Sequence, residues 1–226
     1  MKPTANHPPA VKGSTLRVPP VGTVILCLGS VAVFLVQCAV GLGRSIRGLG
    51  LIPESVWHLE SYASVRPGQW VWPPVALATN MFLHANWFHI AANMSGLWVF
   101  GAMAEPVMGT RRFVLTYLIF GLVTGLVIAA VVPHSTVPMV GASGAIAGIL
   151  GAFLAQYAGS TFGRRRGLPL GLEVSAVLIL AAWFAFRTVP EEPDRLCSVV
   201  YHFVPFLLAW LFVRGTISGK EIHQMS

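Results

Sequence analysis

The stretch FVLTYLIFGLVTGLVIAAVV, residues 113–132, carries no charged side chain and decides the fold class of this chain. A helix of about 20 mostly apolar residues is long enough to cross the hydrocarbon core of a bilayer. The composition points the same way, because 55% of the 226 residues are hydrophobic and 10% are charged, whereas soluble domains carry about 25% charged residues. The sequence therefore predicts an all-α membrane protein.

Similar apolar runs lie on both sides of this stretch, and together they predict six transmembrane helices, over residues 21–42, 75–103, 113–132, 139–157, 170–186 and 199–213. The longest connection covers residues 43–74 and contains Trp57, Trp70 and Trp72. Because amphipathic aromatic side chains favour the membrane interface, we expect this first loop to lie partly in the bilayer surface. We expect residues 1–20 to be a disordered basic cytoplasmic tail, 21–214 the six-span domain and 215–226 a short cytoplasmic tail.

The distribution of basic residues predicts the orientation of the six spans. If the N-terminus is cytoplasmic, ten of the 15 Lys and Arg residues fall on the cytoplasmic side, and five fall outside, namely Arg44, Arg47, Arg66, Arg187 and Arg195. Membrane insertion favours this bias, so we expect both termini in the cytoplasm; a miscounted span is the alternative. Basic residues at span ends also account for the net charge of +7, so we expect no nucleic-acid partner. Without a cleavable signal pattern or targeting peptide, the sequence favours a prokaryotic plasma (inner) membrane.

Polar side chains within the spans are candidates for function, because polar groups in hydrocarbon are costly. In the second span, His89 and Asn93 are four residues apart and share a helix face, and His84 lies five residues before His89. A buried polar pair that joins two helices explains His89 and Asn93 equally well. Two histidines with no third ligand nearby, and no His-Glu-x-x-His motif, argue against a metal site.

Two further polar positions lie in the fourth and sixth spans. Ser143 stands in the motif Gly141-Ala142-Ser143-Gly144, and His202 lies near the start of the last span. Each has an ordinary explanation, because serine can cap a helix, Gly144 can belong to a small-residue packing face, and a single histidine can be structural. However, spans two, four and six enter from the same side, so all the polar side chains lie toward one membrane face.

This convergence predicts the groups that peptide hydrolysis requires, namely a nucleophile, a base and donors to the oxyanion. Ser143 can attack, and His202 can take its proton and later pass it to the leaving amine. Asn93, His89 and the backbone N–H of Ser143 can donate hydrogen bonds to the oxyanion. No acid lies in the outer half of any span, so we expect a Ser–His dyad. An aspartyl mechanism needs two intramembrane aspartates, and Asp194 is the only aspartate in the chain.

These residues resemble the motifs of the rhomboid family of intramembrane serine proteases, over residues 75–214. The resemblance rests on His84-x4-His89-x3-Asn93 in the second span, Gly141-x-Ser143-Gly144 around the nucleophile, His202 as the sixth-span base, and Glu105-x3-Gly109-x-Arg111-Arg112-Phe113 with Tyr117 in the turn between spans two and three. It implies a six-helix core around a central, short fourth span. It also implies that Gly141, Gly144 and His84 support the site, His84 through the first loop or a water site.

The resemblance further implies an endopeptidase that cuts transmembrane segments of membrane-protein substrates near the extracytoplasmic face. Such segments and the lipid bilayer are the expected partners, and neither a metal nor an organic cofactor is expected. The chain differs from the family in three respects: Ala147 replaces an aromatic under the base, Pro205 and Ala209 replace glycines, and Val75-Ala76 stand in place of a Trp-Arg pair. Because proline is tolerated in the first turn of a helix, Pro205 predicts that the last span starts close to His202. We expect Phe203 or Phe206 to hold the His202 ring.

Two other functions are compatible with six spans. One is a catalytically weak or inactive relative that binds transmembrane helices. The other is a small transporter, which would show inverted repeats or ionisable residues at mid-membrane; we find no repeat, and the polar residues cluster near one face. Gly121-x3-Gly125 fits either a dimer face or internal packing, which leaves the oligomeric state open.

Overall fold

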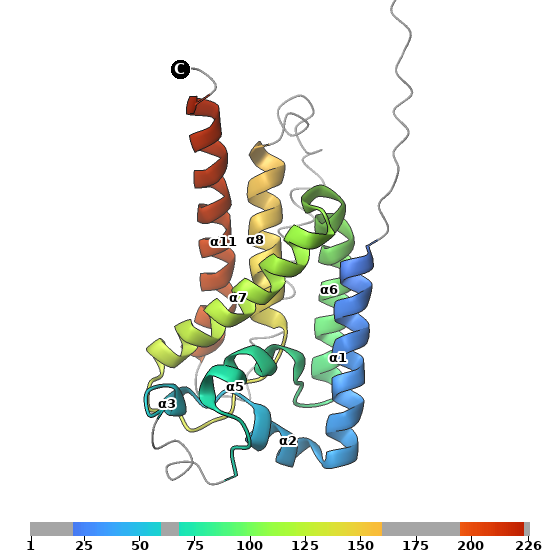
Figure 1. Cartoon of the computed structure of the whole chain (residues 1–226), viewed down its shortest axis with the longest axis vertical. Helices are drawn as coiled ribbons and strands as arrows, with labels where there is room; N and C mark the ends of the chain where they lie inside the picture. The colour runs from blue at the N-terminus through green and yellow to red at the C-terminus, as the bar shows by residue number, and fades with distance from the viewer. Residues whose placement is uncertain (1–19, 60–67, 160–194, 224–226) are drawn as a thin grey trace, which may run out of the picture.

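A computed structural model describes residues 20–59, 68–159 and 195–223 of the chain. Its elements, in chain order, are α1 Val21–Val40, α2 Leu42–Leu49, α3 Pro53–Val56, α5 Pro73–Thr79, the 3-10 helix η1 Asn80–Phe82, α6 Trp87–Met108, α7 Thr110–Val131, α8 Ser143–Gly159 and α11 Arg195–His223. Within the described ranges the chain forms no strand, only an isolated antiparallel bridge between Leu51 and Met139. Figure 1 shows the N-terminal ends of α6, α8 and α11 at the same end of the molecule as α2, α3 and α5.

The expected all-α membrane fold is confirmed by these helices. Helices α1 and α7 are long and apolar enough to cross a membrane, and α8 and α11 contain shorter apolar stretches, Ser143–Gln156 and Val200–Gly215. The predicted spans over 21–42, 113–132 and 139–157 coincide closely with α1, α7 and α8. The predicted fifth span, 170–186, lies outside the described residues.

The predicted second span, 75–103, is wrong as a single helix. The chain forms α5 and η1, becomes extended at Leu83, and begins α6 at Trp87. Asn86 explains the break, because its backbone is extended and its side chain accepts a hydrogen bond from the backbone N–H of His89 at 2.8 Å. A helix N-cap has this geometry. Hence His89 lies in the first turn of α6.

The last helix is longer than the predicted span of 199–213. Helix α11 begins at Arg195 and contains Pro205 in its interior, so the expectation that it starts close to His202 is wrong. A proline inside a helix removes one intrahelical hydrogen bond, and the packing of α11 along α8 offsets that loss. The helix also continues to His223, through residues that the sequence analysis assigns to a tail.

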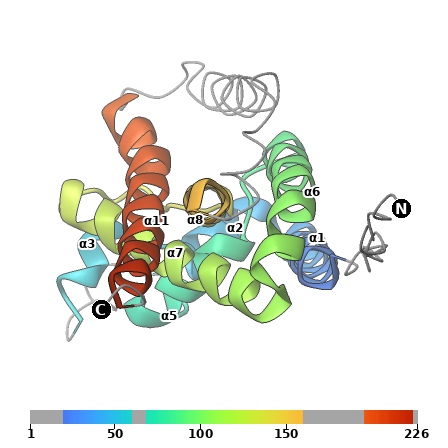
Figure 2. The ribbon, with the colours of Figure 1, turned by 90° about the horizontal axis from the view of Figure 1, so that it is seen from above.

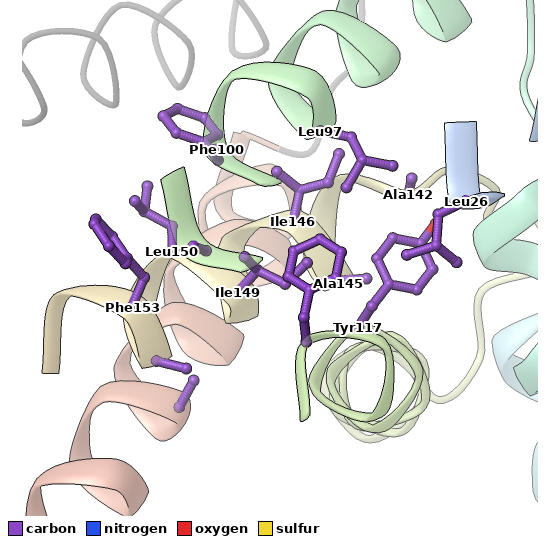
Figure 3. Close-up of a cluster of buried hydrophobic side chains, with 14 of the residues drawn as sticks. Leu26, Leu97, Phe100, Tyr117, Ala142, Ala145, Ile146, Ile149, Leu150 and Phe153 are labelled. Carbon is purple, nitrogen blue, oxygen red and sulfur yellow. The ribbon is translucent and has the colours of Figure 1, made fainter. Parts of the chain in front are cut away.

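Helix α8 lies at the centre of the bundle, with α6, α7 and α11 around it (Figure 2). Every residue from 141 to 153 is buried. Ile146, Ile149 and Leu150 of α8 belong to a hydrophobic cluster that also contains Leu97 of α6 and Tyr117 of α7 (Figure 3). The central fourth helix that the family resemblance implies is therefore present.

Glycines let α7 approach α8 closely. A Cβ atom added to Gly144 would collide with the side chain of Thr124, and one added to Gly148 would collide with the side chain of Phe120. The small-residue packing face predicted for Gly144 is confirmed, and Gly148 belongs to the same face. Close packing of this kind brings the backbones of two helices together.

The other glycine pair in question, Gly121 and Gly125 of α7, faces the inside of the molecule. An added Cβ would lie 2.5 Å from the Met81 side chain at Gly121, and 2.8 Å from the Leu77 side chain at Gly125. Of the two alternatives, internal packing is therefore what these glycines provide, and α7 is fixed against α5 and η1.

At the opposite end of the bundle, the buried carboxylate of Glu105 joins three helices. It accepts hydrogen bonds of 2.7–2.8 Å from the backbone N–H groups of Gly22 and Thr23, and from the hydroxyls of Thr23 and Thr110. The first N–H groups of a helix have no intrahelical partner. Glu105 of α6 therefore caps the start of α1 and holds the start of α7.

Candidate active site

Met139 and Gly141, near the end of the loop before α8, are hydrogen-bonded to Leu51, Asn80 and Tyr201. Met139 and Leu51 of the first loop exchange two backbone hydrogen bonds of 2.7 and 3.0 Å. The backbone N–H of Gly141 donates to the carbonyl of Asn80 at 2.9 Å, and the carbonyl of Gly141 accepts from the hydroxyl of Tyr201 at 3.1 Å. The first loop, η1 and α11 therefore fix the position of Gly141 together.

Gly141 lies directly against the two polar residues predicted from the second span. Its φ of +128° belongs to a region that favours glycine. A Cβ atom added to it would lie 2.7 Å from Nε2 of His89 and 3.5 Å from Nδ2 of Asn93. The structure thus brings Gly141, His89 and Asn93 together, although more than 45 residues separate them in sequence.

The hydrogen bonds of His89 determine which ring nitrogen carries the proton. Asn86 caps the backbone N–H of His89, and the N–H of Ala85 donates to Nδ1 of the ring at 3.3 Å. A nitrogen that accepts a hydrogen bond carries no proton, so the neutral ring is protonated at Nε2. The Nε2–H group therefore faces the loop before Ser143 as a hydrogen-bond donor.

Asn93 lies one helical turn after His89 and is completely buried. Neither atom of its amide has a hydrogen-bond partner among the described residues. Buried amides are nearly always hydrogen-bonded, and exceptions often mark functional sites. A polar pair that glues helices would hydrogen-bond across them, and within the described residues Asn93 makes no such hydrogen bond.

Ser143 is the first residue of α8 and is buried. The backbone N–H groups in the first turn of a helix lack intrahelical partners, and the helix dipole makes this end partly positive. A negatively charged oxygen that forms beside Ser143 would therefore meet backbone donors, and His89 and Asn93 lie against Gly141, two residues earlier. The neighbouring Gly144 acts through packing, as its contact with Thr124 shows.

His202 lies on α11, which packs along α8, and it is also buried. The two helices approach each other closely at Gly151, where an added Cβ would collide with the backbone carbonyl of Phe206. Ser143 lies about two turns before Gly151 on α8, and His202 about one turn before Phe206 on α11. Close approach thus depends on a glycine of α8, a residue that the sequence analysis did not single out.

An aromatic ring lies beside the His202 ring. It belongs to Tyr201, with ring centroids 5.3 Å apart in an edge-on arrangement. Of the two side chains expected to hold the His202 ring, Phe203 is about half exposed and Phe206 is partly buried, and a contact of Phe206 with His202 stays a prediction. Ala147 and Ala209, the two small residues that differ from the family pattern, are buried.

His84 and Gln37 lie behind the site. The buried His84 ring is 5.2 Å from the ring of His89, edge-on. The Gln37 side chain of α1 accepts from the backbone N–H of His84 at 3.0 Å and donates to its carbonyl at 3.4 Å. Gln37 thereby holds the backbone at His84. The backbone N–H of the next residue, Ala85, donates to the His89 ring and orients it. Sequence reasoning missed Gln37, although a polar amide within the apolar first span was the signal that could have found it.

Other chemistries find less support in the described part of the chain. Glu105 caps α1 at the far end of the bundle and is not placed to orient His202. The described residues contain no group of three His, Cys, Asp or Glu side chains that could hold a metal ion. The polar groups gathered around the start of α8 are uncharged, and they suit a hydroxyl nucleophile with hydrogen-bond donors nearby.

Comparison with known proteins agrees with this arrangement. A family model described as the Rhomboid domain matches residues 69–218. The chain is 34% identical over 122 residues to "Rhomboid protease GluP" of Bacillus subtilis, which covers 54% of this chain and 22% of that protein. It is 41% identical over 71 residues to "Rhomboid-like protein 11, chloroplastic" of Arabidopsis thaliana, over 31% of this chain and 25% of the relative.

A mitochondrial relative in yeast, "Rhomboid protein 1, mitochondrial" of Saccharomyces cerevisiae, is 28% identical over 123 residues, which are 53% of this chain and 35% of that protein. The matched stretch thus spans about a third or less of the length of these relatives. The family match covers most of the chain, including every residue of the site from His84 to His202. This chain is an integral membrane protein of the rhomboid family.

Proposed function

We propose that this chain is an intramembrane serine endopeptidase that cleaves transmembrane segments of membrane proteins with a Ser143–His202 dyad. The observation that carries the proposal is the approach of His89 Nε2 and the Asn93 amide to Gly141, two residues before the serine. The same loop is hydrogen-bonded to Tyr201, the neighbour of His202. Three helices thereby contribute to one small polar region in an otherwise apolar bundle.

Each group has a role in the proposed reaction. His202 takes the proton of the Ser143 hydroxyl as the oxygen attacks the scissile carbonyl, and then gives that proton to the leaving amine. The Nε2–H of His89, the amide of Asn93 and the N–H of Ser143 donate to the oxyanion. One such donor typically contributes about 3 kcal/mol of barrier reduction. Water then hydrolyses the acyl-enzyme, with His202 again as the base.

The location of the reaction follows from the charge distribution. With the N-terminus in the cytoplasm, the start of α8 lies toward the extracytoplasmic face, and substrates are cut there. Both described ends, the start of α1 and the end of α11, lie at the opposite end of the bundle (Figure 1). We place the protein in a prokaryotic plasma membrane, in line with its bacterial relative; other relatives are chloroplastic or mitochondrial.

The proposal is tested with the purified full chain in liposomes and a reporter transmembrane segment. Ser143→Ala is expected to abolish cleavage, and His202→Ala to be equally severe, because the two members of a dyad act as a unit. Asn93→Ala is expected to be milder, since other donors remain. Ser30→Ala, at a buried serine within α1, is the matched control and should cleave normally.

A fluorophosphonate probe gives a second readout that needs no substrate. Wild-type protein should be labelled at Ser143, and Ser143→Ala should not be labelled. Cleavage that survives Ser143→Ala would reject the serine as the nucleophile. Wild-type protein that neither cleaves nor labels, but retains its fold, would support the alternative of a relative that only binds transmembrane helices. The names of the relatives include both a protease and rhomboid-like proteins, so this distinction matters.

A further inference from the structure

We propose that Tyr201 is a positioning residue, whose hydroxyl holds the loop before Ser143 at the distance from α11 that proton transfer to His202 requires. This inference rests on the proposed function. It concerns a residue adjacent to the base, on the same helix, whose side chain reaches the segment that carries the nucleophile. Tyr201 itself takes no part in the chemical steps.

The contacts of Tyr201 extend in two directions. Its hydroxyl donates to the carbonyl of Gly141 at 3.1 Å, and its ring lies edge-on to the His202 ring with centroids 5.3 Å apart. The Gly141 N–H is bound to the carbonyl of Asn80, so both polar groups of this glycine are engaged. One tyrosine thus connects the backbone before the nucleophile with the ring of the base.

The composition of the α8–α11 contact explains why such a connection is needed. Ala147 lies one turn after Ser143 on α8, where a small side chain gives little support to an imidazole on the neighbouring helix. Phe203, which follows His202, is about half exposed. The ring contact of Tyr201 therefore gives aromatic support to His202, and its hydroxyl fixes the position of Gly141 relative to α11.

The size of the expected effect follows from the geometry of proton transfer. A misplacement of about 1 Å between reacting groups can cost about 10²-fold in rate. Loss of the hydroxyl removes the hydrogen bond between Gly141 and α11 and leaves the hydrogen bonds of the loop to Leu51 and Asn80. We therefore expect Tyr201→Phe to lower kcat by about ten- to a hundredfold, with KM unchanged, because the substrate-binding surface is not altered.

The matched control is Tyr117→Phe. The Tyr117 hydroxyl also donates to a backbone carbonyl, that of Met81 at 3.3 Å, and this hydrogen bond links α7 to η1. Both variants lose one hydroxyl-to-carbonyl hydrogen bond and keep the aromatic ring. Both should lower the melting temperature, whereas only Tyr201→Phe should lower kcat and the rate of fluorophosphonate labelling.

A readout that does not depend on activity is hydrogen exchange of the peptide over residues 139–146, measured by mass spectrometry in the full-length protein. Tyr201→Phe should accelerate exchange in this peptide, and Tyr117→Phe should not. Wild-type kcat, or unchanged exchange, in Tyr201→Phe would overturn the inference. If Tyr201→Phe accelerates exchange but cleavage survives Ser143→Ala, the proposed function is refuted. The Tyr201 hydrogen bond would then hold the loop without a role in catalysis.

Discussion

Gly141→Ala tests the site geometry more directly than any change to a reactive side chain, because it adds one methyl group and removes no polar atom. The added Cβ would lie 2.7 Å from Nε2 of His89 and 2.9 Å from Cε1 of the same ring. Carbon and nitrogen atoms that are not hydrogen-bonded do not approach this closely. Either the loop before α8 or the ring of His89 must move.

The two costs of this substitution can be calculated separately. Holding a residue with a side chain at a backbone conformation that favours glycine costs about 1–3 kcal/mol of stability. Displacing the His89 ring from the loop removes one oxyanion donor, which is worth about 3 kcal/mol of barrier, or 10²–10³ in kcat. The substitution should therefore lower the melting temperature and, much more strongly, kcat.

A second glycine of the chain separates the two effects. Gly109, between α6 and α7, has a φ of +79°, and a Cβ added there meets no atom within 4 Å. Gly109→Ala thus imposes backbone strain without a collision, and it should lower the melting temperature while leaving kcat unchanged. Both variants are assayed as full-length protein in liposomes, by cleavage of the reporter segment and by thermal unfolding.

The reasoning would be refuted by a Gly141→Ala variant that retains as much kcat as Gly109→Ala. Such a result would mean that His89 does not face the loop before Ser143 during the reaction. A parallel loss of kcat and melting temperature in both variants would also count against a specific role for the His89 contact. A loss of kcat confined to Gly141→Ala is the expected outcome.

Three further substitutions test other parts of the structure. Glu105→Gln should lower the free energy of unfolding by about 3 kcal/mol, because an amide cannot accept all the hydrogen bonds that the buried carboxylate accepts. The kcat measured below the melting temperature should be unchanged, and a large loss of kcat would contradict a capping role. Gln37→Leu should reduce kcat, because the turn that orients His89 loses its two hydrogen bonds to the Gln37 amide, and an effect on melting temperature alone would refute this. Gly151→Ala should lower both kcat and melting temperature by separating α8 from α11, whereas Gly29→Ala, whose added Cβ meets nothing within 4 Å, should do neither.

Much of the architecture could be predicted from the sequence, because the dominant signals are local. An apolar run of about 20 residues is long enough to cross the bilayer as a helix. The ends of α1 and α7 could therefore be predicted within a few residues. The small-residue spacing of Gly144 and Gly148 likewise predicts close helix packing without reference to the partner helix. The motifs around His89, Asn93 and Ser143 also carry their own chemistry, and these residues could be selected from the sequence alone.

Two predicted helix boundaries were wrong because they were read from hydropathy or from proline alone, whereas helix capping and packing decided the structure. The run over 75–103 is apolar enough for one helix, but Asn86 satisfies the N–H of His89 and divides it. Pro205 suggested a helix start, yet packing along α8 keeps α11 helical on both sides of the proline. In both cases a local rule was overruled by hydrogen bonds or contacts that composition does not record.

The sequence by itself determined that this is a helical membrane protein with a serine and histidines in three of its apolar segments. Only the tertiary structure decided that Gly141 lies against His89 and Asn93, that Gly151 meets Phe206, and that Tyr201 and Gln37 are hydrogen-bonded to Gly141 and His84. The physical reason is that these relations depend on which faces of distant helices touch. A pattern within one segment specifies its own faces, but it does not specify the neighbour, the depth or the rotation at which another helix will meet it.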